Sequence, residues 1–280
     1  MKIAIIGVGL IGGSIALKLR QENIVHHVFG VDQNQNHLQT AIDRGIIDEA
    51  TTLDNALAQA ELIFLAIPVD AARKLLPQVL DHATKQQTVM DVGSTKCGIT
   101  AAVKNHPNRQ RYVAFHPMWG TENSGPGAAT AESFSGRAAV ICNAEESAKD
   151  ALETASHIAE NLGMHLIYMS AEDHDLHTAY ISHISHITSY ALANTVLEKE
   201  REEDTIFQLA STGFSSTVRL AKSHPEMWVP IFRQNKENVL DVLNEHITQL
   251  RKFKSALEKE NYDYLEELIR NANKIRGILK

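Results

Sequence analysis

The chain has 280 residues, of which 44% are hydrophobic and 22% are charged, and its formal net charge is −7. This composition is typical of a globular protein of about two domains, and the negative charge argues against nonspecific nucleic-acid binding, which needs a basic surface. No stretch reaches the ~18 uninterrupted apolar residues of a membrane span. We therefore expect a soluble cytoplasmic protein with neither a nucleic-acid nor a membrane partner. Since Cys97 and Cys142 lie in no metal-ligand spacing, we expect neither a disulfide nor a metal site.

Residues 1–169 alternate between short apolar runs and segments with helical periodicity. The runs predict buried parallel strands at Lys2–Gly7, Val28–Asp32, Leu62–Ile67, Thr88–Asp91, Tyr112–Phe115, Ala138–Cys142 and His165–Met169. The helical segments are Ile11–Arg20, Asn36–Arg44, Ala71–His82, Ile99–Lys104 and Ser147–Leu162. This alternation predicts an α/β fold, with a doubly wound Rossmann-type parallel sheet over residues 1–169.

Residues 170–280 show no further strand pattern. Apolar residues recur at helical spacing in Ala179–Leu197, Pro225–Leu250 and Tyr262–Ile278. The sequence therefore predicts an all-helical C-terminal domain, joined to the sheet domain by a stiff junction near Ser170.

A G-x-G-x-x-G motif lies between the first predicted strand and the first helix. Gly7 permits the tight turn, Gly9 lets the backbone approach a pyrophosphate, and Gly12 allows close helix–strand packing. The first turn of the predicted helix, with Ile11 and the preceding Leu10, offers unpaired N–H groups to phosphate oxygens. These five residues predict a dinucleotide site, with a glycine turn that binds no nucleotide as the alternative.

Asp32 ends the second predicted strand, twenty residues after Gly12. A carboxylate here accepts hydrogen bonds from the adenosine ribose and repels a 2′-phosphate, so we predict NAD rather than NADP as cofactor. The alternative is that Asp32 is only a strand-end or helix-capping residue. Pro68, after the Leu62–Ile67 strand, either shapes the loop beside the nicotinamide ribose or only begins the next helix.

Two further strand ends carry candidate catalytic side chains. Ser94 follows the Thr88–Asp91 strand, where its hydroxyl either faces the crevice or, like that of Thr95, caps the next helix. His116 ends the Tyr112–Phe115 strand. An imidazole at the carboxyl edge of such a sheet can take a proton from a hydroxyl that loses hydride, or it can order a turn.

The helical half carries candidate substrate-binding residues. Ser182 and His186 are four residues apart and share one helix face, so they either line a substrate cleft or belong to the core. Arg219 lies in an apolar context and needs a carboxylate partner, from the substrate or from the protein. We expect His174 and His177 to lie at the surface or at a helix start.

Taken together, these residues resemble the prephenate and arogenate dehydrogenases of tyrosine biosynthesis. The resemblance covers nearly the whole chain and rests on the segments GVGLIGGS, DVGSTK, HPMWG, SHISH and RLAKSHPEMW. The glycine turn is shared with many dehydrogenases, whereas the HP-containing, S-H-x-x-H and late arginine segments are far more specific. The stretch Ser211–Ser216 differs from the Gly/Arg/Asp-rich version typical of the family.

This resemblance implies NAD-dependent oxidative decarboxylation of prephenate to 4-hydroxyphenylpyruvate, in which hydride leaves C4 of the ring and carbon dioxide leaves C1. By the family pattern, His116 polarises the 4-hydroxyl, and Ser94 assists at the same oxygen. Arg219 then holds a substrate carboxylate, and Ser182 and His186 contact the substrate from the helical domain. The resemblance also implies a homodimer formed through that domain.

Three alternatives remain open from the sequence. The substrate could be arogenate, which carries an amino group where prephenate has a keto group. The chain could instead be a β-hydroxyacid or imino-acid dehydrogenase of similar two-domain plan. A different class of function is a non-catalytic NAD-responsive binding protein, which would bind the cofactor and oxidise no cyclohexadienyl acid.

Overall fold

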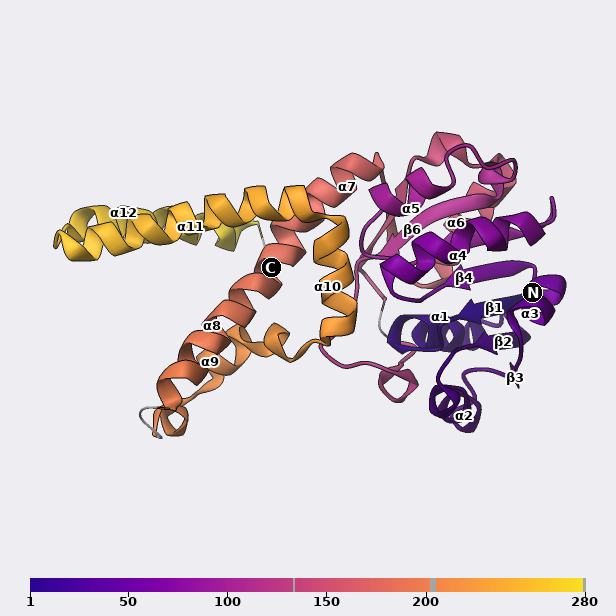
Figure 1. The fold of residues 1–280 in the computed structure, drawn as a ribbon, viewed down its shortest axis with the longest axis horizontal. Helices are drawn as coiled ribbons and strands as arrows, with labels where there is room; N and C mark the ends of the chain where they lie inside the picture. Colours follow the sequence, from indigo (N-terminus) through magenta and orange to yellow (C-terminus); the bar gives the residue numbers. More distant parts are fainter. Residues whose placement is uncertain (133, 202–204, 279–280) are drawn as a thin grey trace. The chain divides into compact units, whose positions relative to one another are not determined.

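The structure is a computed structural model that describes residues 1–132, 134–201 and 205–278. Within it the chain forms two compact units, residues 1–235 and residues 236–280. The first unit contains the sheet and all the helices that precede residue 236 (Figure 1). None of the helices in the described ranges combines the length and the apolarity that a membrane span needs.

The first unit is built on a sheet whose eight described strands follow the order β3-β2-β1-β4-β5-β6-β7-β8. Their bounds are β1 Lys2–Ile6, β2 His27–Val31, β3 Glu49–Ala50, β4 Leu62–Leu65, β5 Thr88–Asp91, β6 Tyr112–Pro117, β7 Ala138–Cys142 and β8 His165–Met169. The fold class predicted from the sequence is confirmed, because β1, β2, β4, β5 and β6 pair in parallel in the doubly wound order.

The sequence pattern predicted a sheet that is parallel throughout, and this prediction was wrong for one pair of neighbouring strands. β7 pairs antiparallel with β6, while β8 is parallel to β7. A parallel return needs a long crossover, usually a helix, whereas the link between β6 and β7 contains only the 3-10 turn Pro126–Ala128 in its described part. The chain therefore reverses. The two-residue strand β3 and helix α3 also went unpredicted, because they are too short to show a period.

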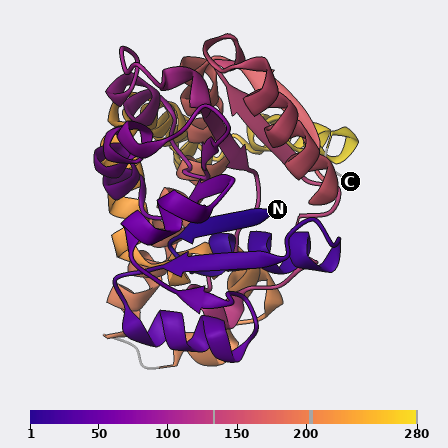
Figure 2. The same ribbon diagram turned by 90° about the vertical axis from the view of Figure 1, so that its right-hand side faces the viewer.

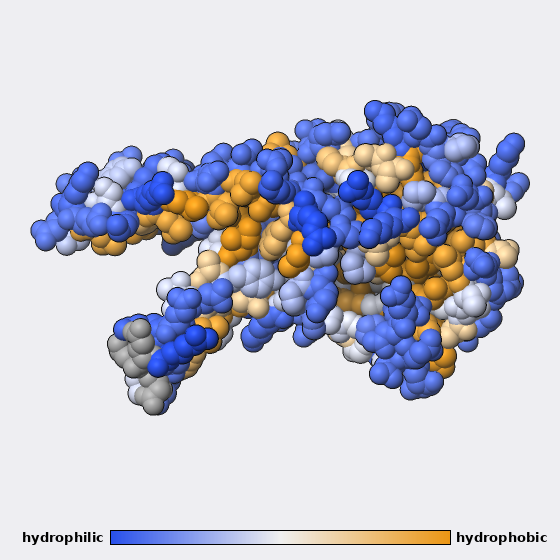
Figure 3. Space-filling view, in the orientation of Figure 1, coloured by the Kyte–Doolittle hydropathy of each residue, from blue (hydrophilic) through white to orange (hydrophobic). Residues whose placement is uncertain are grey.

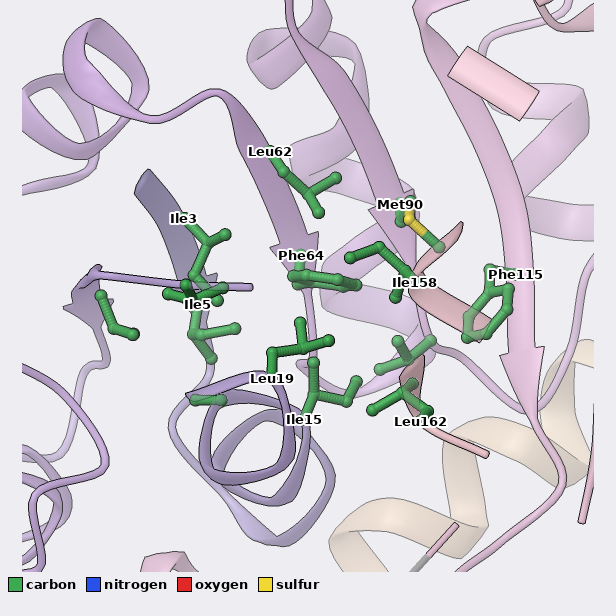
Figure 4. Close-up of a cluster of buried hydrophobic side chains, with 14 of the residues drawn as sticks. Ile3, Ile5, Ile15, Leu19, Leu62, Phe64, Met90, Phe115, Ile158 and Leu162 are labelled. Atoms are coloured by element: carbon green, nitrogen blue, oxygen red, sulfur yellow. The ribbon is translucent and has the colours of Figure 1, made fainter. Parts of the chain in front are cut away.

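Helices cover both faces of the sheet (Figure 1 and Figure 2). They are α1 Leu10–Gln21, α2 Gln35–Asp43, α3 Leu53–Gln59, α4 Val69–His82, α5 Cys97–Ala102 and α6 Lys149–Asn161. One core lies under α1 and α6, where Ile15, Leu19 and Ile158 meet Phe64 and Ile5 of the sheet (Figure 4). A second core lies under α3, α4 and α5. Because both faces are buried, the strands are apolar almost throughout, which explains why the sequence revealed them.

The helices after β8 belong to the same unit as the sheet. They are α7 Ala171–Thr178, the π-helical turn Ala179–His183, α8 Ile184–Glu200, α9 Thr212–Thr217, the 3-10 turn Arg219–Lys222 and α10 Pro225–Gln234. Helix α7 contacts α5 and β7, and α10 contacts α4 and contributes Trp228 and Ile231 to the second core. The division of the chain into domains 1–169 and 170–280 stays a prediction. In the structure these helices pack directly on the sheet, and the two compact units meet after residue 235 in the sequence.

The second unit consists of α11 Lys236–Glu258, α12 Tyr262–Ala272 and the 3-10 turn Asn273–Gly277. Apolar side chains gather along one edge of this unit and polar ones along the other (Figure 3). Leu250, Leu257 and Tyr262 are each more than half exposed. Exposed apolar side chains in a contiguous patch are typical of a surface that contacts another protein.

Candidate active site

The turn between β1 and α1 is shaped by its glycines. Gly7 has a φ of +97°, and a Cβ there would lie 2.3 Å from the carbonyl oxygen of Ala66. A Cβ on Gly12 would lie 2.4 Å from the carbonyl oxygen of Gly7, so both positions exclude any side chain. Gly9, at the N-cap of α1, is different, because a Cβ there would meet no described atom within 4 Å.

The open side of this turn is suited to a pyrophosphate. Gly9 leaves the space in front of the helix clear, and the N–H groups of the first turn, which includes Leu10 and Ile11, have no intrahelical partner. They also present the positive end of the helix dipole. The residues present therefore fit a dinucleotide. Gly7 and Gly12 allow the helix to begin close to the end of β1, so that its first N–H groups can reach the pyrophosphate.

Asp32 connects this turn to the end of β2. Its carboxylate accepts hydrogen bonds from the backbone N–H of Val8 at 3.1 Å and of Asn34 at 2.8 Å. The capping role is excluded, because Asn34 is the N-cap of α2. Pro68 is the exposed N-cap residue of α4, so it does begin that helix.

His116 lies in β6 near its carboxyl end and is 8% exposed. Its Nδ1 is 2.8 Å from Nε2 of His174, and Nδ1 of His174 is 2.8 Å from Oδ1 of Asp175. The same carboxylate accepts hydrogen bonds from the backbone N–H groups of Lys96 at 2.7 Å and Cys97 at 2.9 Å. Of the two placements expected for His174, the surface was wrong, since this residue is only 1% exposed, whereas it does lie in the first turn of a helix, α7.

The start of α5 also differs from the sequence prediction. Neither Ser94 nor Thr95 caps this helix; Lys96 is the N-cap, with no side-chain cap of its own. The first N–H groups are instead bonded by Asp175 of α7. Thr95 donates to Oε1 of Gln234 at 3.1 Å, and Ser94 is half-buried after β5. Because capping does not occupy the Ser94 hydroxyl, its catalytic role stays a prediction.

A buried lysine holds the end of β6 in place. Nζ of Lys96 donates to Oδ2 of Asp91 and to the carbonyl oxygen of Phe115, both at 2.6 Å. The hydroxyl of Tyr112 donates to Oδ1 of the same aspartate at 2.6 Å. Lys96 and Asp91 are completely buried, and a buried charge is tolerated only when it is paired and hydrogen-bonded. This network fixes the residue that immediately precedes His116.

The environment keeps the histidines of the site neutral. Burial lowers the pKa of His116 well below 6.5, and His174, Lys96 and His183 lower it further. Burial also lowers the pKa of His174, although the hydrogen bond to Asp175 opposes this shift. A neutral imidazole can accept a proton, so His116 has the protonation state of a general base at neutral pH.

Arg219 begins the 3-10 turn after α9, where it is half exposed. Its Nη1 donates to Oε2 of Glu122 at 2.6 Å. Glu122 lies in the loop after β6, six residues beyond His116, and together with Lys222 and His224 it lines an open depression. The sequence predicted a carboxylate partner for Arg219, and in the structure that partner is Glu122 of the protein itself.

Ser182 and His186 lie at the junction of the π-helical turn and α8. Nδ1 of His186 hydrogen-bonds to the carbonyl oxygen of Ser182 at 3.0 Å, and its ring stacks on that of Trp228 with centroids 3.4 Å apart. Burial lowers the pKa of His186, and the charge of Arg219 lowers it further. His186 and Arg219 are therefore electrostatic neighbours, as His183 and His116 are.

Residues 15–168 match the sequence model "Prephenate dehydrogenase, nucleotide-binding domain", and residues 170–271 match "Prephenate dehydrogenase, dimerization domain". The chain belongs to the prephenate dehydrogenase family. The family predicted from the sequence is therefore confirmed, and the protein is a dehydrogenase.

Individual relatives span nearly the whole chain. The prephenate dehydrogenase of Bacillus subtilis is 29% identical over 277 residues, which are 98% of this chain and 75% of the relative. The cyclohexadienyl dehydrogenase of Zymomonas mobilis is 29% identical, with 99% of this chain and 96% of the relative covered.

Two solved structures share the fold of the entire chain. Prephenate dehydrogenase from Aquifex aeolicus, in complex with hydroxyphenyl propionate and NAD+, has a TM-score of 0.91 at 29% identity and covers 100% of this chain and 98% of its own. The arogenate dehydrogenase of Synechocystis has a TM-score of 0.75 at 27% identity, with 100% of both chains covered. NAD as cofactor is confirmed at the level of the family's nucleotide-binding domain, whereas the preference over NADP and the roles of single residues stay predictions.

The buried His183 makes folding stability sensitive to acid. Burial lowers its pKa from 6.5 to about 4. Between these values the unfolded chain binds a proton that the folded chain does not, so stability falls as pH falls, by about 1.4 kcal/mol per pH unit from this group. We expect His183→Gln to reduce the slope of the free energy of unfolding against pH between about pH 6.5 and 4.5, measured with urea, while the other buried histidines keep their share of it.

The matched control is His177→Gln, which alters an exposed histidine near the same π-helical turn. It should leave the slope of stability against pH unchanged. A His183→Gln protein with the slope of the wild type would show that this histidine is protonated when folded.

Proposed function

We propose that this chain catalyses the NAD-dependent oxidative decarboxylation of prephenate to 4-hydroxyphenylpyruvate in tyrosine biosynthesis. The observation that carries the proposal is the state of His116: a neutral, buried imidazole at the carboxyl end of β6, bonded to the protein through Nδ1. No described residue hydrogen-bonds to its Nε2. This atom is also not enclosed by the protein, unlike the buried polar atoms that have no hydrogen-bond partner, such as Nε2 of His183. Nε2 is therefore accessible to a substrate hydroxyl.

The cofactor's place is the turn described above. Gly7, Gly9 and Gly12, with the first turn of α1, would hold the pyrophosphate, and Asp32 would accept hydrogen bonds from the ribose. Bound NAD+ supplies the hydride acceptor. The protein's own contributions are to align the ring and to manage one proton.

The proton path follows from the geometry of His116. As hydride leaves C4 of the ring, Nε2 of His116 takes the proton of the 4-hydroxyl, and the C–O bond becomes a carbonyl. The electron pair of the breaking bond between C1 and the carboxylate then flows toward that carbonyl, carbon dioxide departs, and the proton returns to the oxygen. The ring thereby becomes a phenol, and aromaticity drives the reaction forward.

Arg219 is proposed to hold a carboxylate of the substrate. Glu122 uses one N–H of its guanidinium, which leaves four donors for a second anion. His186, Ser182 and Ser94 are proposed to contact the substrate as well. Hydrogen bonds join the two helical segments and support this arrangement: Ser189 of α8 donates to the carbonyl oxygen of Thr217 and accepts from the backbone N–H of Ala221, both at 3.0 Å.

We also propose a homodimer formed through the helical domain, residues 170–280. The dimerization-domain match over residues 170–271 supports it, as do the exposed apolar side chains of α11 and α12. Sedimentation equilibrium at micromolar concentration should give twice the mass of one chain; a monomer at all concentrations would contradict this part of the proposal.

The deciding experiment measures formation of reduced nicotinamide by absorbance, with prephenate or arogenate and with NAD+ or NADP+. We expect the highest kcat/KM for prephenate with NAD+. A higher value for arogenate would favour the second candidate, to which the similarity with the Synechocystis enzyme points. Cofactor binding without turnover of either acid would overturn the proposal and favour a binding protein or a dehydrogenase of another hydroxy acid.

Replacing the base tests the proton path. His116→Asn should lower kcat by about 10²–10⁴-fold and leave KM for prephenate largely unchanged, because the base acts mainly in the transition state. Steady-state kinetics with NAD+ provide the measurement, and His177→Asn, at an exposed histidine, is the control. Turnover near that of the wild type would mean that His116 is not the base.

Replacing the proposed carboxylate ligand tests substrate binding. Arg219→Ala should raise KM for prephenate by roughly 10–100-fold with little change in kcat, since a charge-assisted hydrogen bond contributes about 1.5–3 kcal/mol. Arg233→Ala is a matched control, because Arg233 forms a comparable exposed ion pair with Asp70. Equal KM values for the two variants would assign Arg219 a structural role only.

A further inference from the structure

Three buried side chains form a continuous line of hydrogen bonds that ends at the proposed base. From the inside outward they are the carboxylate of Asp175, the imidazole of His174 and the imidazole of His116, with 2.8 Å at each junction. The first two are each 1% exposed. Asp175 and His174 are consecutive residues of α7, whereas His116 belongs to β6.

The direction of every hydrogen bond in this line is set by Asp175. Its Oδ1 accepts from Lys96 N–H and its Oδ2 from Cys97 N–H, which favours the ionised carboxylate. Burial by itself raises the pKa of Asp175, but the hydrogen bonds from His174 and from these backbone groups outweigh it. An ionised carboxylate only accepts, so Nδ1 of His174 must be the donor.

The hydrogen bond between His174 and His116 is directed in the same way. A neutral imidazole carries one proton, so His174 with a proton on Nδ1 has a lone pair on Nε2. That lone pair can accept only if Nδ1 of His116 donates. His116 then has its single proton on Nδ1, and its Nε2 is left with a lone pair.

We propose that His174 and Asp175 are positioning residues that fix His116 in the tautomer whose Nε2 is unprotonated and open to the substrate. This inference rests on the proposed role of His116 as the base. The opposite tautomer would present an N–H to the substrate hydroxyl and could not take its proton. When the proton arrives at Nε2, the line of donors also connects the new positive charge to the buried carboxylate, which stabilises it.

Substitutions of His174 separate polarity from packing. His174→Leu removes both hydrogen bonds and should lower kcat by about 10²-fold or more, with KM for prephenate little changed. His174→Gln should keep kcat within about tenfold of the wild type, because an amide can accept from His116 through its oxygen and donate to Asp175 through its nitrogen.

Thr178→Val is the matched control for packing of the same helix. The Thr178 hydroxyl is buried and donates to the backbone carbonyl oxygens of His174 at 2.9 Å and Asp175 at 3.2 Å, and it hydrogen-bonds to neither imidazole. We expect kcat near that of the wild type for this variant. A His174→Leu protein as active as the wild type, or equal losses in the Leu and Gln variants, would overturn the proposal.

The tautomer can be read without any substrate. In protein with ¹⁵N-labelled histidine, protonated and unprotonated ring nitrogens have well-separated chemical shifts, and the His116 signals are assigned by their loss in His116→Asn. We expect a proton on Nδ1 in the wild type and a shift toward Nε2–H in Asp175→Asn.

A wild-type His116 with its proton on Nε2 would overturn the inference, whatever the enzyme's activity. Failure of the wild type to oxidise prephenate would instead refute the proposed function, since the tautomer measurement involves neither substrate nor cofactor. The two proposals are thus tested separately.

Discussion

The carboxylate of Asp175 is the interaction on which the arrangement of the site depends. A buried anion must be surrounded by donors, and its donors come from two separate parts of the chain: the backbone that begins α5 and the imidazole of His174 in α7. Satisfying this one charge therefore holds α7 against the start of α5. It also orients the ring that touches His116.

A second buried ionic group holds the end of β6, the strand that carries His116. Lys96 and Asp91 are both completely buried, and each is satisfied by further hydrogen bonds, from Lys96 to the carbonyl oxygen of Phe115 and from Tyr112 to Asp91. Removing one partner of such a pair leaves an uncompensated charge, which costs about 3–5 kcal/mol. Two buried ionic groups thus converge on the end of β6, where a misplaced imidazole would lose alignment with a substrate.

Local patterns were sufficient for much of the fold and for part of the site. Apolar runs revealed all the longer strands because both faces of the sheet are buried, and the glycine motif was recognisable because Gly7 and Gly12 exclude any side chain. Residues that act through distant contacts were missed. His174 was expected at the surface or at a helix start, yet its side chain is buried on α7 with those of Ala171 and Thr178. The buried face of this helix is mostly polar, so it shows no apolar periodicity from which its burial could have been predicted.

The sequence by itself determined the fold class, the position of the cofactor turn and the candidate base, because each depends on neighbouring residues and on short-range sterics. Tertiary structure alone decided that β7 runs antiparallel, that Asp175 rather than Ser94 or Thr95 satisfies the start of α5, and that Glu122 pairs with Arg219. The last two outcomes depend on contacts between residues that are 79 and 97 positions apart in the chain. Hydrogen bonds and ion pairs act over a few ångströms in space, whereas a sequence pattern records only separation along the backbone.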